Sequence, residues 1–141
     1  MEAIIEPRYL NPRGACPAQG MYSHVGRATA GNLYFVAGQL AVGSDGSVVG
    51  NGDFDAQFKQ VFSNLLTVVS GLDANCDDIV KLTTYLVHSQ SIDRFMTLRA
   101  ELFPTMFKGP LYPPNTLVVV NRLVKEDFLI EVEAVVQDPH G

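Results

Sequence analysis

The clearest periodic pattern in the chain lies between Asp53 and Leu72, where apolar side chains recur with the spacing of an α-helix. They fall on one helix face and comprise Phe58, Val61, Phe62, Leu65, Val69 and Leu72. Asp53 or Asp55 can cap the start of this helix. A second helix is expected to begin at Ser91 and to end at Pro104, because proline disfavours helical continuation. Its apolar stripe comprises Phe95, Leu98 and Leu102.

Shorter apolar runs on either side of these helices indicate β-strands. They are Tyr22–Ala28, Leu33–Gln39, Ile79–His88, Thr116–Leu123 and Phe128–Gln137. An Asp-Gly pair between Val42 and Val48 predicts a hairpin. Residues 1–20 are rich in proline and glycine and are expected to form a loop-like lead-in across the surface. The pattern predicts a single α+β domain over residues 1–141, with two helices and a mixed sheet of five to six strands.

The two predicted helices can cover only one face of the predicted sheet, and the uncovered second face indicates a partner subunit. A sheet of five or six strands is about 25–30 Å wide, and two helices of about 10 Å diameter can cover only one of its faces. The runs Leu33–Ala37, Val80–Val87 and Leu117–Val120 are nevertheless apolar on both faces. Because monomers rarely expose such large apolar patches, we expect another copy of the chain to cover the second face.

Composition narrows the class of function. The formal net charge is −5 and no run of Lys or Arg occurs, which argues against binding to a nucleic-acid backbone. No apolar stretch is long enough to span a membrane, and the acidic start does not resemble an export signal, so we expect a cytoplasmic protein. Cys16 and Cys76 are expected to be reduced thiols. The scattered histidines have no metal-ligand spacing, and no metal site is expected.

Several segments, taken in order, resemble the RidA/YjgF family of imine and enamine deaminases, also called the L-PSP endoribonuclease family. The matching segments are Tyr22-Ser23, Gly31–Gln39, Asp77–Thr84, Tyr112–Thr116, Arg122-Leu123 and Ile130–Ala134. The resemblance implies a chorismate-mutase-like subunit and a homotrimer in which three sheets form a barrel with clefts between subunits. It also implies hydrolysis of imines or enamines to 2-oxo compounds and ammonia, with no metal or organic cofactor.

The catalytic residue implied by the resemblance is Glu131, which matches the family glutamate that orients a water molecule. An ionised group in an apolar strand is costly unless it faces water, a partner or a substrate. The alternative is that Glu131 and Glu133 are paired or solvated strand residues. Glu133 lies two residues further on the same face and is expected to be structural.

The carboxylate-binding arginine of the family is missing, and its position is occupied by Asn115. Asparagine supplies hydrogen bonds but neither charge nor a bidentate fork, so binding of a small imino acid should weaken. Arg99, on the second helix, is a candidate replacement; the alternative is a solvated helix arginine. Arg122 is a poorer candidate replacement. It lies seven residues after Asn115, an odd number, so strand alternation predicts that it points to the opposite sheet face.

The remaining pocket positions follow from the same resemblance. Tyr22 matches a pocket tyrosine, with packing as the alternative, and Gly38 matches a glycine whose backbone approaches the ligand. Ala37 occupies a position where members often carry a serine, so a hydroxyl is absent there. Leu117 occupies a position where some members have a cysteine, so no thiol chemistry is expected. His24 is expected to be a surface histidine without a catalytic partner.

Three functions stay open at this point. The first is a hydrolytic deaminase whose specificity is altered by Asn115. The second is a trimer of the same fold that binds a small metabolite without turnover or acts like a chaperone, and the third is the ribonuclease activity of the older family name. The acidic composition disfavours the third.

Overall fold

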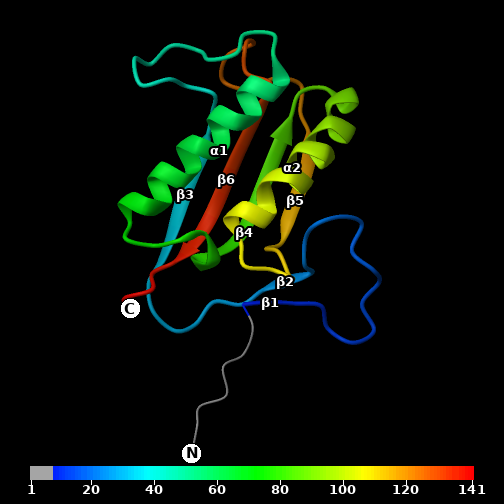
Figure 1. Cartoon of the computed structure of the whole chain (residues 1–141), viewed down its shortest axis with the longest axis vertical. Helices are drawn as coiled ribbons and strands as arrows, with labels where there is room; N and C mark the ends of the chain where they lie inside the picture. The colour runs from blue at the N-terminus through cyan, green and yellow to red at the C-terminus, as the bar shows by residue number, and fades with distance from the viewer. Residues whose placement is uncertain (1–7) are drawn as a thin grey trace, which may run out of the picture.

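The computed structural model of the chain describes residues 8–141 and contains two α-helices packed on one face of a β-sheet (Figure 1). The helices are α1 (Phe54–Gly71) and α2 (Ile92–Met106). The strands are β1 (Tyr9–Leu10), β2 (Val25–Gly26), β3 (Leu33–Gln39), β4 (Ile79–Leu86), β5 (Asn115–Val119) and β6 (Ile130–Gln137). Two 3₁₀ turns, Cys76–Asp78 and Ser89–Ser91, flank β4. The predicted α+β class is confirmed.

The main sheet is mixed and has the order β3-β6-β4-β5. Strand β6 runs antiparallel to both β3 and β4, whereas β5 is parallel to β4. The prediction of five to six strands in this sheet was wrong, since β1 and β2 pair with each other in a separate two-stranded sheet. The expected strand Tyr22–Ala28 is reduced to β2, because its first residues belong to a loop.

The lead-in also differs from the expectation of a plain loop. Tyr9 in β1 is buried, and its hydroxyl donates a hydrogen bond to the Ile79 carbonyl oxygen over 2.6 Å. This contact fastens the N-terminal sheet to the start of β4. The expectations for residues 1–7, including the absence of an export signal, lie outside the described residues.

Helix α1 follows its predicted pattern closely. Asp53 is the N-cap, and its side chain accepts a hydrogen bond from the Ala56 amide. The predicted end of α2 at Pro104 was wrong, because the helix continues to Met106 with Pro104 inside it. Phe103 and Phe107 are both buried, and the Phe107 amide donates to the Phe103 carbonyl oxygen. Packing of these two rings therefore holds the last turn despite the proline.

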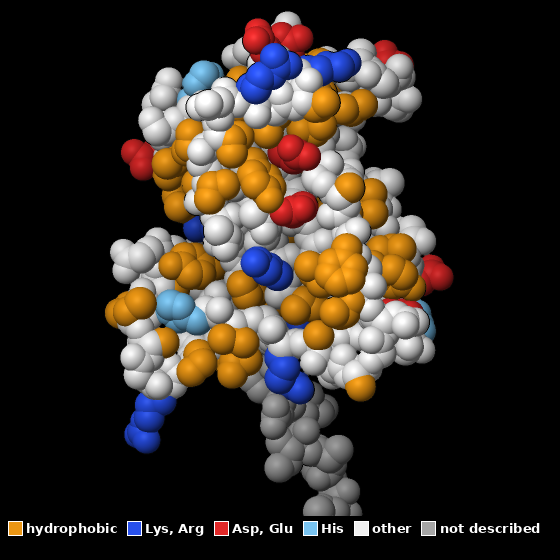
Figure 2. Space-filling model, turned by 180° about the vertical axis from the view of Figure 1, so that it is seen from behind, with side chains coloured by type: hydrophobic (Ala, Val, Ile, Leu, Met, Phe, Trp, Pro, Cys, Tyr) orange, Lys and Arg blue, Asp and Glu red, His pale blue; other side chains and the backbone are white. Residues whose placement is uncertain are grey.

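The hydrophobic core lies between the helices and the sheet, and the opposite sheet face carries apolar side chains without cover. Phe35 in β3 is 78% exposed, and Val118 in β5 is also exposed. Figure 2 shows this face from behind, with hydrophobic side chains surrounding acidic and basic groups. The predicted hairpin appears as an isolated bridge between Val42 and Val48. Within residues 8–141, no helix is both long and apolar enough to cross a membrane.

Candidate functional site

Glu131 projects from the central strand β6 onto the uncovered sheet face. The adjacent side chains Ile130 and Val132 are fully buried on the helix side, so strand alternation directs Glu131 away from the core. Its carboxylate lies over Gly38 of β3, where any Cβ atom would overlap it. Partial burial, aided by the negative charge of Glu133, raises the pKa of Glu131. No hydrogen bond to its carboxylate is found among the described residues.

Glu133 has a different environment on the same face. The Tyr85 hydroxyl donates a hydrogen bond to Glu133 Oε1, and this bond raises the pKa of Tyr85. Glu133 therefore has a fixed partner, as a structural residue should. The two carboxylates of β6 are thus distinguished by their neighbours, with Glu131 left available.

Asn115 is the first residue of β5 and is directed toward the helices. It pairs with Leu82 of β4, whose side chain is fully buried under α1 and α2. The Thr84 hydroxyl donates to Asn115 Oδ1 over 3.0 Å. This bond leaves Asn115 Nδ2 buried without a hydrogen-bond partner. Thr84 was missed by the sequence analysis, although a threonine between Leu82 and Leu86 on the core face is a detectable signal.

Arg99 lies on the inner face of α2, and only 2% of its surface is exposed. Its guanidinium carbon lies 5.3 Å from the ring centre of Phe95 and 5.9 Å from that of Phe103. Its Nη2 atom is 2.9 Å from the Met96 sulfur, and its Nε atom is buried without a partner. Burial lowers the pKa of Arg99, with an opposing effect of Tyr22. The interpretation of Arg99 as a solvated helix residue was wrong.

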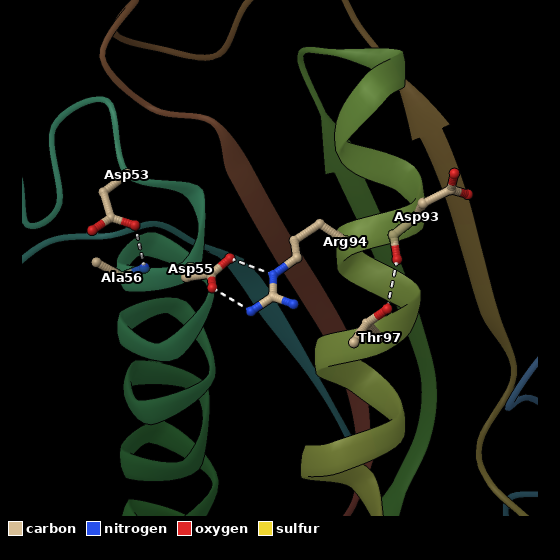
Figure 3. Close-up of polar contacts among 6 residues, drawn as sticks. All are labelled: Asp53, Asp55, Ala56, Asp93, Arg94 and Thr97. Carbon is tan, nitrogen blue, oxygen red and sulfur yellow. Dashed lines mark hydrogen bonds and ion pairs between the residues drawn. The ribbon is translucent and has the colours of Figure 1, made fainter.

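Two other arginines have carboxylate partners. Arg94 of α2 forms a fork with Asp55 of α1, with Nε–Oδ1 at 2.8 Å and Nη2–Oδ2 at 2.5 Å (Figure 3). Arg122 lies in the loop after β5 and contacts Glu126 over 3.4 Å. Because β5 ends at Val119, the argument from strand alternation does not apply to Arg122. Arg99, in contrast, has no carboxylate within ion-pair distance among residues 8–141.

A cavity of about 400 Å³ brings several predicted residues together. Its lining consists of Gln19, Tyr22, Met96, Arg99, Asn115, Thr116 and Leu117. Tyr22, Arg99, Asn115 and Leu117 were all predicted as substrate-binding positions. Gln19 and Met96 were missed, since neither lies in a conspicuous pattern. The backbone N–H of Gln19 donates to the Tyr22 hydroxyl over 3.1 Å, which links the N-terminal loop to the cavity wall.

The other predicted residues lie on the opposite side of the same sheet. Gly38 and Glu131 are neighbours there, and Ala37 lines a shallow hollow with Glu133. Glu131 pairs with Tyr85 across the sheet, whereas Asn115 pairs with Leu82, so their side chains leave by opposite faces. One copy of the chain therefore does not bring Glu131 and Asn115 into a single cavity.

Comparison with known proteins gives a consistent result. The sequence model of a family described as endoribonuclease L-PSP matches residues 13–137. A RutC family protein of Pyrococcus horikoshii is 32% identical over 106 residues, which cover 75% of this chain and 79% of that protein. The RutC family protein YjgH of Escherichia coli is 29% identical over 134 residues, covering 93% and 96%. The crystal structure of YyfB of Yersinia pestis, from the Rid protein family, superposes with a TM-score of 0.81 at 28% identity and covers 92% of this chain and 97% of that one.

Proposed function

Because the chain belongs to the RidA/YjgF family, whose sequence model is described as endoribonuclease L-PSP, we propose that it hydrolyses reactive imines or enamines to 2-oxo compounds and ammonia. The observation that carries this proposal is the state of Glu131. Its carboxylate is unpartnered among the described residues, is placed against the backbone of Gly38 and has a raised pKa. Such a group suits the positioning and deprotonation of a water molecule.

The proposed reaction needs only proton transfer and positioning. Water adds to the carbon of the C=N bond, and Glu131 takes the proton that the water loses. The same proton is returned to the nitrogen and gives a carbinolamine. The hydroxyl proton of this adduct then passes through Glu131 to the amine nitrogen, so that the C–N bond breaks and leaves a carbonyl group and ammonia. An enamine enters the same sequence after it has tautomerised to the imine. Asn115, held by Thr84, presents its amide donor to the substrate, and Gly38 permits close approach of the backbone. Asn115 replaces a charged arginine and thereby alters specificity.

The proposed site is completed by a second copy of the chain. Glu131 and Asn115 leave the sheet by opposite faces, so a common cleft requires the Glu131 face of one copy to meet the Asn115 edge of another. The uncovered apolar face and the exposed Phe35 support such packing. We propose a homotrimer that works in the cytoplasm, where the free Cys16 and Cys76 stay reduced. Light scattering that gives a monomeric mass in dilute solution would contradict this assembly.

A second candidate is a trimer of this fold that binds a small metabolite, or acts like a chaperone, without turnover. It is favoured by one observation, namely that Asn115 supplies no charge at the position of the family arginine. Charge-assisted hydrogen bonds contribute about 1.5–3 kcal/mol, so the exchange should weaken carboxylate binding at position 115 by about 10- to 150-fold. Binding of a ligand with no acceleration of imine decay would favour this candidate.

The deciding experiment follows imine decay after an amino-acid oxidase generates the substrate. Glu131→Gln should lower the rate by about 10²–10⁴-fold. Glu133→Gln is the matched control on the same strand and face, and it should retain most of the rate because Glu133 already bonds Tyr85. An unchanged rate in Glu131→Gln would remove Glu131 from the mechanism.

The pH dependence gives an independent check on the same residue. The reaction needs ionised Glu131, whose pKa lies above its ordinary value. The acid limb of kcat/KM should therefore fall at a higher pH than an exposed glutamate would give, and activity should rise as the pH passes through it. Glu133→Gln removes a nearby negative charge and should move this limb to lower pH.

A further inference from the structure

We propose that Arg99 is the anchor for the carboxylate of the ligand, and that the ligand is a monoanion with an apolar body. This inference names the substrate class for the cavity that contains Asn115. It rests on the proposed function for the reaction that follows, whereas the binding itself can be measured without turnover. The anchor lies on helix α2 and not on strand β5.

The first argument is the unbalanced charge of Arg99. Taking a guanidinium out of water costs several kcal/mol unless hydrogen bonds and a counter-charge compensate. Arg99 is 2% exposed, and its described neighbours include the rings of Phe95 and Phe103, the sulfur of Met96, the backbone of Gly20 and the side chain of Tyr22. None of these neighbours carries a negative charge. An anion in the cavity would supply the missing partner.

The second argument is the hydrogen-bonding character of the cavity. Arg99 Nε and Asn115 Nδ2 are both buried and both lack a partner. Both are donors, and the orientation of Asn115 is fixed because its Oδ1 accepts from Thr84. Buried donors without partners are rare in folded proteins. Two of them in the lining of one cavity call for a ligand that offers acceptor oxygens.

The third argument decides between a carboxylate and a phosphate group. Within one copy of the chain, Arg99 is the only charged residue among the described residues that line the cavity, and Glu131, which the proposed assembly brings in from another copy, would add a negative charge. A carboxylate brings one negative charge and matches one guanidinium in a planar, bidentate geometry. A phosphate monoester brings nearly two charges at neutral pH and would leave part of its charge buried without compensation.

The rest of the lining defines the body of the ligand. Met96, Leu117 and the ring of Tyr22 present apolar surface, and the volume of about 400 Å³ exceeds the space that a bare two- or three-carbon acid fills. A branched aliphatic substituent would bury this surface and gain about 0.8 kcal/mol per buried CH₂ group. The geometry points to a monocarboxylate with a branched aliphatic body, and the proposed reaction would make it a 2-imino acid.

Binding is tested by calorimetric titration of the full-length protein with 4-methylpentanoate, 4-methylpentanamide and inorganic phosphate. The acid should bind, and the amide, which has the same shape without the charge, should bind about 10- to 150-fold more weakly. Arg99→Met should lose the same factor for the acid and almost nothing for the amide. Arg94→Met, on the same helix but ion-paired with Asp55, should leave both affinities unchanged.

Each alternative has a distinct outcome. Equal affinity for acid and amide, or tighter binding of phosphate than of the acid, would overturn the inference. Tighter binding of the acid in Glu131→Gln would also overturn it, because Glu131 of another copy would then be the natural partner of Arg99. If Glu131→Gln binds the acid as wild type does but loses turnover, both proposals are supported. If the wild-type protein binds the acid but shows no turnover at all, only the proposed function is contradicted.

A structural role for Arg99 is separated by thermal unfolding. The ligand-free Arg99→Met protein should melt at or above the wild-type temperature, because replacing a buried unpaired charge by an apolar side chain is often neutral or stabilising. A large loss of stability with unchanged acid binding would show that Arg99 serves packing alone. If Arg99→Met does not fold, Arg99→Lys keeps the charge and loses the fork, and it should bind the acid more weakly than Arg94→Lys does.

Discussion

Helix α2 carries two arginines, and they occupy opposite extremes of environment. Arg94 lies near the helix start with about half of its side chain exposed, and both of its bonds to Asp55 are made in contact with solvent (Figure 3). Arg99 lies five residues later on the inner face, buried between two aromatic rings, with no carboxylate partner among residues 8–141. The guanidinium of Arg94 therefore has a carboxylate partner, whereas that of Arg99 has none among residues 8–141.

The contrast shows why the number of ion pairs says little about function. A solvent-exposed pair such as Arg94–Asp55 contributes little to stability, because water and salt screen it. A buried guanidinium without a partner lowers stability, and such a cost is typical of a binding site. Arg99 is therefore the more informative of the two, although it makes fewer polar contacts.

Among the changes that test this comparison, the largest loss of acid affinity is expected when Arg99 is given the partner it lacks. Met96→Glu places a carboxylate one helical turn from Arg99, where the Met96 sulfur already lies 2.9 Å from Nη2. The new internal pair should occupy the guanidinium and repel an incoming acid, so affinity for 4-methylpentanoate should fall on the order of 100-fold. Titration calorimetry measures the change.

Met96→Gln is the matched control, since it has nearly the same shape without the charge. It should keep the affinity within about tenfold of wild type, because a neutral amide competes only as an ordinary hydrogen-bond partner. Equal losses in the two variants would mean that Met96 contributes through shape, and the electrostatic contrast between the two arginines would fail.

A smaller effect is expected from shifting Arg99 without changing its charge. A Cβ atom at Gly20 would lie 2.6 Å from Arg99 Nη2, so Gly20→Ala must displace the tip of the side chain. Misaligned hydrogen bonds lose about 0.5–1.5 kcal/mol, which predicts a 2- to 10-fold weaker affinity for the acid. Gly71→Ala, on a helix end with open space around its Cβ position, is the control. An unchanged affinity in Gly20→Ala would show that the guanidinium position is not critical.

The smallest effect is expected at the exposed pair. Asp55→Asn removes the partner of Arg94, and acid binding in the cavity should stay unchanged. Arg94 holds the pKa of Asp55 below its ordinary value, so the contribution of Asp55 to stability is present above that ordinary value and is lost as the pH falls through the depressed pKa. Thermal melts in low and high salt should show a slight loss that salt removes. A large, salt-insensitive loss would contradict the comparison.

The fold was predictable wherever one face of an element alone met the core. The stripe of α1 and the cap at Asp53 follow from periodicity and hydrogen-bonding chemistry, and both are present. The strand count failed because the segment around Val25 pairs with Tyr9–Leu10, a short local pairing that has no alternating pattern. Such short strands depend on tertiary contacts like the Tyr9–Ile79 hydrogen bond.

Most residues of the cavity were predicted from the sequence, but the burial of Arg99 was not. The apolar stripe predicted for the second helix omitted Phe103, although this residue precedes Pro104 and lies within the expected helix. With Phe103 included, Phe95, Arg99 and Phe103 recur every four residues on one buried face. The burial of the charge therefore depends on how this helix face packs in the folded chain, which the apolar stripe alone does not reveal. Whether these residues act together stays a prediction.

The hydrogen bond between Thr84 and Asn115 couples two positions on different strands. Thr84 is fully buried, and its hydroxyl has Asn115 Oδ1 as its partner. A substitution at either position alone leaves the other polar group buried without a hydrogen-bond partner, which lowers the free energy of unfolding by about 1–3 kcal/mol. A longer side chain at position 115 would therefore also require a change at position 84, so we expect the two positions to vary together.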